Sequence, residues 1–192
     1  MKKIETAISN DFCPQTMFIY GTYKEDGTPD FGLFCWISYC WDKELGVMAC
    51  IGGEKLTKDR IRKTKCFSAN LVTEELLPLA DYYGSNDGYK ANKAKAHPVE
   101  TERGRKLNVP ILSQSPVSFE LEVAQSIPLD DGEVFLCKIR NVLISEELAD
   151  TSVSVEARIA GIAPVSTTCE TYFSWDGKNI GEWNKVQKQL YP

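Results

Sequence analysis

The residues with the clearest chemical potential stand around a glycine pair in the first third of the chain. Gly52-Gly53 precedes Lys55, Thr57 and Arg60, and we expect Thr57 to cap a short helix that runs to about Lys63. Unpaired N–H groups at a helix start, the helix dipole, a hydroxyl and two cations all favour an anion, and glycines allow its close approach. The pattern indicates a phosphate site, with a solvated basic helix face as the alternative interpretation.

A stretch of aromatic residues lies shortly before this glycine pair. Residues 31–41 are almost wholly apolar and β-prone, so we expect one continuous strand in which alternate side chains face opposite sides. One face would carry Asp30, Gly32, Phe34, Trp36 and Ser38, and the other would carry Cys35, Ile37 and Tyr39. A flat apolar surface beside a phosphate site suits FMN, whereas a central barrel strand buried on both faces is the alternative.

Other kinds of site receive little support. The single histidine, His97, lies in a polar stretch, which argues against a catalytic triad or a histidine-based metal site. The seven cysteines contain no Cys-x-x-Cys pair, so we predict no metal site, no structural disulfide and a cytoplasmic location. The net charge of −5 indicates no nucleic-acid partner, and no apolar run approaches the length needed for a membrane partner.

A series of strands must hold these candidate residues in place. We expect an amphipathic helix over residues 74–83, and a polar surface excursion over residues 84–108 whose length favours a functional role. The expected strands and further ordered pieces are residues 17–22, 31–41, 45–51, 66–72, 117–123, 134–139, 159–164 and 171–175. The sequence predicts one mainly β, α+β domain over residues 1–192, a closed or half-closed barrel with short peripheral helices.

The order of these motifs resembles the flavin reductase-like, FMN-binding split-barrel family, and within it the flavoredoxin-like branch. In that family a threonine after the second meander strand precedes a helix, and a strand ending Phe-x-Val-Asn follows. Here Thr57 matches the threonine, Ile61 lies in the helix, and residues 67–70, Phe-Ser-Ala-Asn, match the strand end. The family's mid-chain lysine corresponds to Lys93. The resemblance continues through residues 108–112, 119–120, 172–173 and 180–181, and it covers roughly residues 12–183.

The resemblance implies a flavoprotein whose FMN takes a hydride from NADH or NADPH and passes electrons to a small-molecule or protein acceptor. It implies a homodimer with FMN near the interface. At the phosphate it places Lys55, Thr57 and Lys93. Around the ring and ribityl chain it places Asp30, Phe34, Cys35, Trp36, Ile37, Ser38, Cys50 and Ile51, with Phe173 as a stacking residue from the other subunit.

The sequence departs from the family pattern at two places. Asp30 stands where the family often has asparagine, so this side chain can accept a hydrogen bond but cannot donate one when ionised. Residues 131–133 read Asp-Gly-Glu where the family often has Gly-Asp-His, which makes flavin binding better supported than activity toward NAD(P)H. Two alternatives therefore stay open: a non-enzymatic FMN electron carrier reduced by a partner protein, and a flavin-free barrel that serves as an interaction module.

Overall fold

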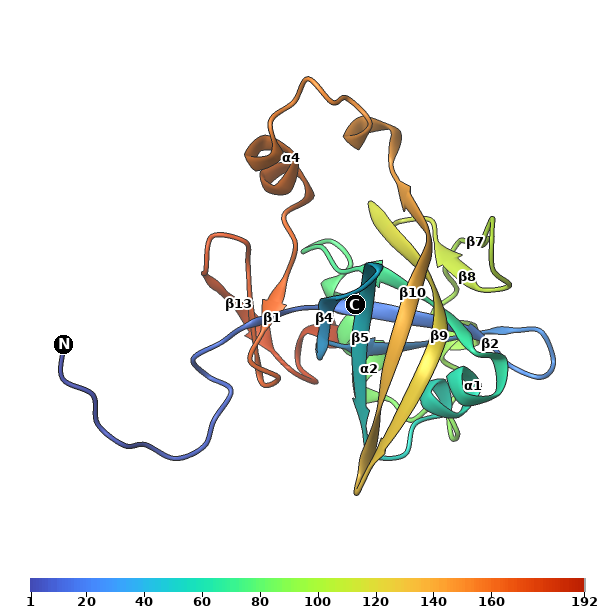
Figure 1. Ribbon diagram of the computed structural model, residues 1–192, viewed down its shortest axis with the longest axis horizontal. Coiled ribbons are helices and arrows are strands. Elements are labelled where there is room, and N and C mark those ends of the chain that lie inside the picture. The colour runs from blue at the N-terminus through green and yellow to red at the C-terminus, as the bar shows by residue number, and fades with distance from the viewer. Residues whose placement is uncertain (192) are drawn as a thin grey trace.

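A seven-stranded antiparallel sheet forms the body of the molecule (Figure 1). The computed structural model describes residues 1–191, and its main sheet has the strand order β3-β2-β6-β9-β10-β5-β4. The strands are β2 (Phe18–Tyr23), β3 (Pro29–Phe34), β4 (Ile37–Asp42), β5 (Glu44–Gly52), β6 (Cys66–Leu71), β9 (Val117–Leu129) and β10 (Gly132–Ile144). This architecture confirms the predicted mainly β fold, although β9 and β10 extend well beyond their predicted ends.

Only two residues join the two edge strands of this sheet. β3 ends at Phe34 and β4 begins at Ile37, so Cys35 and Trp36 span from one edge to the other. Three peptide units reach at most about 11 Å, so the sheet must curl until its edges nearly meet. No hydrogen-bonded ladder joins β3 to β4 within residues 1–191, and the result is a barrel split at this corner.

The prediction of one continuous strand over residues 31–41 is therefore wrong. The chain turns a corner at Cys35 and Trp36, and the two halves of the expected strand pair with different partners, β2 and β5. Apolar composition gave no sign of this corner, because the residues on both sides of it are equally β-prone. The face assignment built on strict alternation fails at the same point.

Alternate positions of the strands fill the inside of the barrel. These buried side chains are Tyr20, Val47, Ala49, Ile51, Ile61, Phe67, Ala69, Leu121, Phe135 and Cys137. Ile61 comes from α1 (Leu56–Thr64), the helix predicted to end near Lys63. Because this core contact fixes α1, the first turn of the helix has a definite place relative to β3 and β5.

A second core covers the other face of β2. Ile19 points into this outer core while its neighbour Tyr20 points into the barrel, as alternation requires. The outer layer consists mainly of α2 (Leu77–Ser85) and the C-terminal 3-10 helix η2 (Val186–Leu190). Helix α2 begins later than the predicted residue 74, at the turn that precedes Pro78.

A buried carboxylate ties the C-terminal segment to α2. Asp81 of α2 has no exposed surface, and it accepts hydrogen bonds from Tyr172 Oη at 2.7 Å, Asn184 N at 2.7 Å and Gln187 N at 2.8 Å. Backbone N–H groups that are far away in the sequence thereby find a partner inside the protein. These hydrogen bonds join residues 172–187 to α2, in addition to the packing of Tyr172 and Val186 in the outer core.

Shorter elements complete the chain. They are β1 (Gln15–Thr16), α3 (Lys93–Ala96), β7 (Thr101–Arg103), β8 (Pro110–Leu112), η1 (Glu146–Leu148), α4 (Val155–Ile162), β11 (Ser166–Thr167), β12 (Thr171–Phe173) and β13 (Asn179–Glu182). Figure 1 shows α4 and its connecting loops standing away from the barrel, and the first residues of the chain running outward. Among the helices that the structure describes, none combines the length and apolar character of a membrane span.

Candidate functional site

Two adjoining cavities form one cleft beside β3 and the start of α1. The smaller cavity has a volume of about 250 Å³ and the larger a volume of about 640 Å³. They share the wall residues Leu33, Phe34, Lys55, Gly84 and Trp183. We call the smaller cavity the polar end of the cleft and the larger one the apolar end.

The polar end lies at the first turn of α1. Lys55 occupies the position before the helix, and no side chain of the described residues caps this helix start. The prediction that Thr57 is the cap is wrong: Thr57 lies inside the helix, and its Oγ1 donates a hydrogen bond to Asp30 Oδ2 at 2.9 Å. The first-turn N–H groups therefore have no side-chain acceptor and can serve a ligand at this end of the cleft.

A glycine allows α1 to lie directly against β3. A Cβ atom at Gly32 would come within 2.9 Å of Thr57 Oγ1 and within 2.8 Å of a ring carbon of Phe34, closer than real Cβ contacts. On the other side of the helix start, Gly53 has a φ of +63°, a conformation that glycine adopts without strain. The two glycines explain how the turn and the helix reach this position.

Lys93 approaches the polar end from the polar excursion. Its side chain is 5% exposed, and Nζ donates a hydrogen bond to Tyr83 O at 3.1 Å. Burial lowers the pKa of Lys93, and the negative charge of Asp30 opposes this effect. Burial likewise raises the pKa of Asp30, against the influence of Lys93. A buried cation and a buried carboxylate thus share this end of the cleft without forming a direct ion pair.

The hydroxyl group of Tyr83 is the unsatisfied atom of this wall. Tyr83 is 1% exposed and lines the polar end, and its Oη has no hydrogen-bond partner among the described residues. A buried polar atom without a partner costs free energy. The polar end is therefore lined by two lysines, the first turn of α1 with its uncapped N–H groups, and a tyrosine whose hydroxyl has no partner, which is a suitable donor set for an oxyanion.

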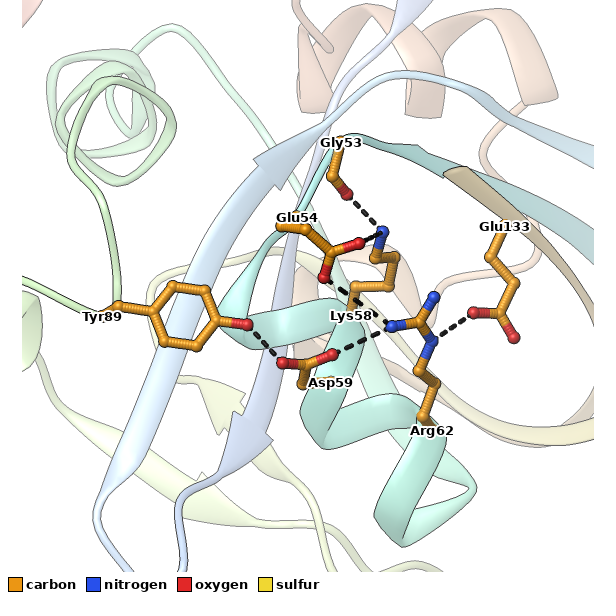
Figure 2. A network of polar contacts seen from close by, with 7 residues as sticks. All are labelled: Gly53, Glu54, Lys58, Asp59, Arg62, Tyr89 and Glu133. Atoms are coloured by element: carbon orange, nitrogen blue, oxygen red, sulfur yellow. Dashed lines mark hydrogen bonds and ion pairs between the residues drawn. The ribbon is translucent and has the colours of Figure 1, made fainter. Parts of the chain in front are cut away.

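The remaining basic residues of α1 are engaged elsewhere. Lys58 is nearly fully buried, and its Nζ donates to Gly53 O and to Glu54 at 3.0 Å, as Figure 2 shows. Arg60, which the sequence placed in the anion site, instead donates to Tyr23 O at 2.9 Å and pairs with Glu25. Of the basic residues predicted for the anion site, Lys55 and Lys93 line the polar end and Arg60 does not.

Figure 2 also shows how α1 is tied to the barrel hairpin. Arg62 bridges Asp59 at 3.0 Å and Glu133 of β10 at 2.5 Å, and Tyr89 donates a hydrogen bond to Asp59. The network holds the helix against the end of the β9–β10 hairpin. Glu133, which stands where the family often has histidine, has its carboxylate on Arg62 and lines neither end of the cleft.

The apolar end contains four of the predicted ring residues. Phe34, Cys35 and Trp36 line it from the sheet corner, and Cys50 lines it from β5. Trp36 is 50% exposed, so its ring stands at the opening rather than in a core. The corner that broke the predicted strand is what turns these side chains toward one space.

Four predicted residues lie away from the cleft. Ile37 and Ser38 line a separate cavity of about 530 Å³, because they follow the corner and belong to β4. Ile51 is 1% exposed inside the barrel, and Phe173 of β12 lines neither end of the cleft. The structure does not bring these four together with the rest. Asp30 does not line the polar end itself but lies directly behind its wall, where it accepts the hydrogen bond from Thr57.

Several wall residues escaped sequence reasoning. They are Leu33, Tyr83, residues 84–88, Cys169, Tyr172 and Trp183. The loop over residues 86–88 follows α2 and reads Asn-Asp-Gly, residue types that favour turns, so the sequence carried a local signal for it. Nothing local marks Cys169, Tyr172 or Trp183, because β12 and the C-terminal segment reach the cleft through tertiary contacts alone.

The chain is similar to known proteins in sequence pattern and in fold. Residues 10–162 match the family model described as the flavin reductase like domain. The solved structure of a flavoredoxin of Desulfovibrio vulgaris (Miyazaki F) is 20% identical in sequence and superposes with a TM-score of 0.75. The match covers 95% of this chain and 94% of the flavoredoxin. A flavoredoxin from Methanosarcina acetivorans is 18% identical, with a TM-score of 0.78, and the match covers 99% of this chain and 100% of the flavoredoxin.

A third solved structure carries a different activity in its name. The 2-nitrobenzoate 2-nitroreductase of Pseudomonas fluorescens shares 16% identity and a TM-score of 0.77, over 88% of this chain and 85% of its own. At these identities the structures show a common fold, which confirms the predicted split β-barrel. A search of curated proteins finds no significant match.

Proposed function

The chain belongs to the family of flavin reductase-like domains, and from this premise we propose that its cleft binds FMN and that it is an NAD(P)H-dependent oxidoreductase. One observation carries the proposal: a donor-rich polar end and a broader apolar end meet in one cleft at Phe34 and Lys55. FMN has the matching form, a phosphate at one end and a flat ring system at the other. The sequence has no Gly-x-Gly-x-x-Gly motif for a pyrophosphate, which favours FMN over FAD.

The polar end would hold the phosphate. Lys93 and the first-turn N–H groups of α1 would make the direct contacts, with Lys55 at the rim. Thr57 already donates its hydroxyl proton to Asp30, so it contacts a phosphate as a donor only after this hydroxyl turns. The apolar end would hold the ring against Phe34, Cys35, Trp36 and Cys50, and Phe173 would stack on it from the other subunit. Bound FMN supplies the two-electron chemistry, and the protein positions it.

The electron-carrier alternative is supported by one specific contact. Glu133 takes the position of the family's histidine, and its carboxylate is bound to Arg62. This side chain gives the cleft no proton donor and no contact for a nicotinamide. If that histidine is needed for NAD(P)H, the protein would instead receive electrons from a partner protein and hand them to an acceptor.

The visible spectrum of the purified protein tests the proposal. We expect the apoprotein to bind FMN more tightly than FAD, as measured by quenching of flavin fluorescence, because the cleft presents donors for one terminal phosphate. Addition of NADH or NADPH under anaerobic conditions should then bleach the flavin absorbance. Flavin binding without bleaching would support the electron carrier. Tighter binding of FAD than of FMN would contradict the FMN assignment. Absence of flavin binding would contradict both flavoprotein functions and support the flavin-free interaction module.

We also propose that the protein is a homodimer. Large apolar side chains remain uncovered along β4 and near β12, among them Tyr39 at 59% exposure, Trp41 at 76% and Trp175 at 56%. Exposed aromatic residues in such number favour a covered surface. Light scattering at micromolar concentration should give about twice the chain mass of 21.5 kDa. A mass near that of one chain, with FMN present, would overturn this proposal.

A further inference from the structure

Two cysteine side chains meet at the apolar end of the cleft. The Sγ atoms of Cys35 and Cys169 lie 3.7 Å apart, and both residues line this end. The chain brings them together from positions that are 134 residues apart. Cys35 stands at the sheet corner between β3 and β4, and Cys169 in the tight turn between β11 and β12. Cys35 thus belongs to the barrel sheet and Cys169 to the small sheet β1-β11-β12-β13 beside it.

The turn at Cys169 is held in an unusual conformation. Its φ is +75°, a region that residues other than glycine seldom occupy and that is concentrated at functional sites. The N–H group of Cys169 donates to Thr167 Oγ1 at 2.9 Å, and Asn10 Nδ2 donates to the sulfur of Cys169 at 3.0 Å. The backbone and both polar contacts thus hold this sulfur toward Cys35.

We propose that Cys35 and Cys169 form a redox-active dithiol, which closes to a disulfide by exchange with an external disulfide. A disulfide requires an S–S distance of about 2.05 Å, so the two sulfurs need to approach by less than about 2 Å. This activity goes beyond the proposed function and needs no flavin. It adds a second two-electron centre in the wall of the cleft.

The exchange balances as follows. The Cys169 thiolate attacks one sulfur of the external disulfide, forms a mixed disulfide and releases one thiol after protonation. Cys35 then loses its proton, attacks the sulfur of Cys169 and displaces the second external thiol. The two cysteines lose two electrons and two protons, and the external disulfide is reduced to two thiols.

The surroundings of the two sulfurs assign this order. Burial, together with the neighbouring Cys169, raises the pKa of the Cys35 thiol to about 12, so this thiol stays protonated at neutral pH. Only a thiolate attacks a disulfide. The sulfur of Cys169, by contrast, accepts a hydrogen bond from Asn10 Nδ2 at 3.0 Å, and this donor can support the negative charge of an attacking sulfur. Cys169 is therefore the first sulfur to react, and Cys35 reacts second, once the mixed disulfide stands beside it.

Redox titration of the full-length protein tests the dithiol directly. The protein is equilibrated with oxidised and reduced glutathione at stepped ratios, its free thiols are alkylated, and its peptides are analysed by mass spectrometry. We expect one peptide pair linked through Cys35 and Cys169, and a fall from seven free thiols to five. Retention of seven thiols, a link between other cysteines, or glutathione adducts alone would each overturn the proposal.

Single variants test the order of attack. In Cys35→Ser, glutathione should remain trapped on Cys169, and this adduct should form at least about tenfold faster than an adduct on Cys35 in Cys169→Ser. Cys66→Ser, which replaces a partly buried cysteine outside the cleft, should titrate like the unchanged protein. Equal rates in the two cleft variants would overturn the assigned order, and loss of the link in Cys66→Ser would overturn the pairing.

Discussion

Replacing Lys93 by alanine is expected to weaken FMN binding by about 10- to 100-fold and to leave riboflavin binding almost unchanged. Lys93 is the buried cation of the polar end, and a charge-assisted hydrogen bond contributes roughly 1.5–3 kcal/mol. Each ~1.4 kcal/mol corresponds to a tenfold change in the dissociation constant. Because riboflavin has no phosphate, it should lose nothing at this position. Fluorescence quenching with both ligands measures the difference.

Lys95→Ala is the matched control for this experiment. Lys95 lies on the same short helix but is exposed, so the Lys95→Ala variant should bind both flavins as the unchanged protein does. If Lys93→Ala weakens riboflavin as much as FMN, Lys93 acts on the ring or on the fold, and the phosphate assignment is wrong. If neither ligand is affected, Lys55 becomes the better candidate, since Arg60 is held by Tyr23 and Glu25.

Replacing Asp81 by alanine is expected to lower the free energy of unfolding by about 3–5 kcal/mol. The change leaves three donors without an acceptor, the buried hydroxyl of Tyr172 and the partly buried N–H groups of Asn184 and Gln187, and an unsatisfied buried group costs roughly 1–3 kcal/mol. Urea denaturation measures the loss as a lower midpoint with an unchanged slope. In this variant the C-terminal segment should become less firmly held, and so should Trp183, which forms part of the cleft wall.

Asp176→Ala is the control for Asp81→Ala. It tests whether the removal of any hydrogen-bonded carboxylate lowers the free energy of unfolding by the same amount. Asp176 also accepts hydrogen bonds, from Ser174 and Lys178, but it is exposed. Its removal should cost less than about 1 kcal/mol. An equal loss in the two variants would show that the contacts of Asp81 do not hold the C-terminal segment.

The sequence was sufficient for features that local patterns encode. Short β-prone apolar runs predicted β2, β5 and β6, and alternation with an Asp-Gly turn predicted the β9–β10 hairpin. A helix-start signal predicted α1, and helical spacing predicted most of α2. Glycines, a hydroxyl and a cation at a helix start located the polar end near Lys55 and Thr57, and these signals depend only on neighbours in the chain. The family resemblance added Lys93.

Tertiary packing decided the rest. The corner at Cys35 and Trp36 lies in a uniformly apolar stretch, so no residue type marked the break. Thr57 was a plausible cap by type, yet the proximity of β3 gave its hydroxyl a better partner in Asp30. Cys35 was predicted at the flavin ring and Cys169 was given no role in a site, and only the fold shows that their sulfurs meet.

The two-residue corner has a consequence for how this barrel folds. The hairpins β2–β3 and β4–β5 are local and adjacent in the chain, yet they form opposite edges of the sheet. β6, β9 and β10 must pair between them, through partners such as Gly21 with Ser68 and Cys50 with Val134. Loop closure over such separations is slow, since its entropic cost comes before the contacts form. In kinetic terms this is a non-local β protein, and its cleft assembles only when the last of these pairings closes the barrel.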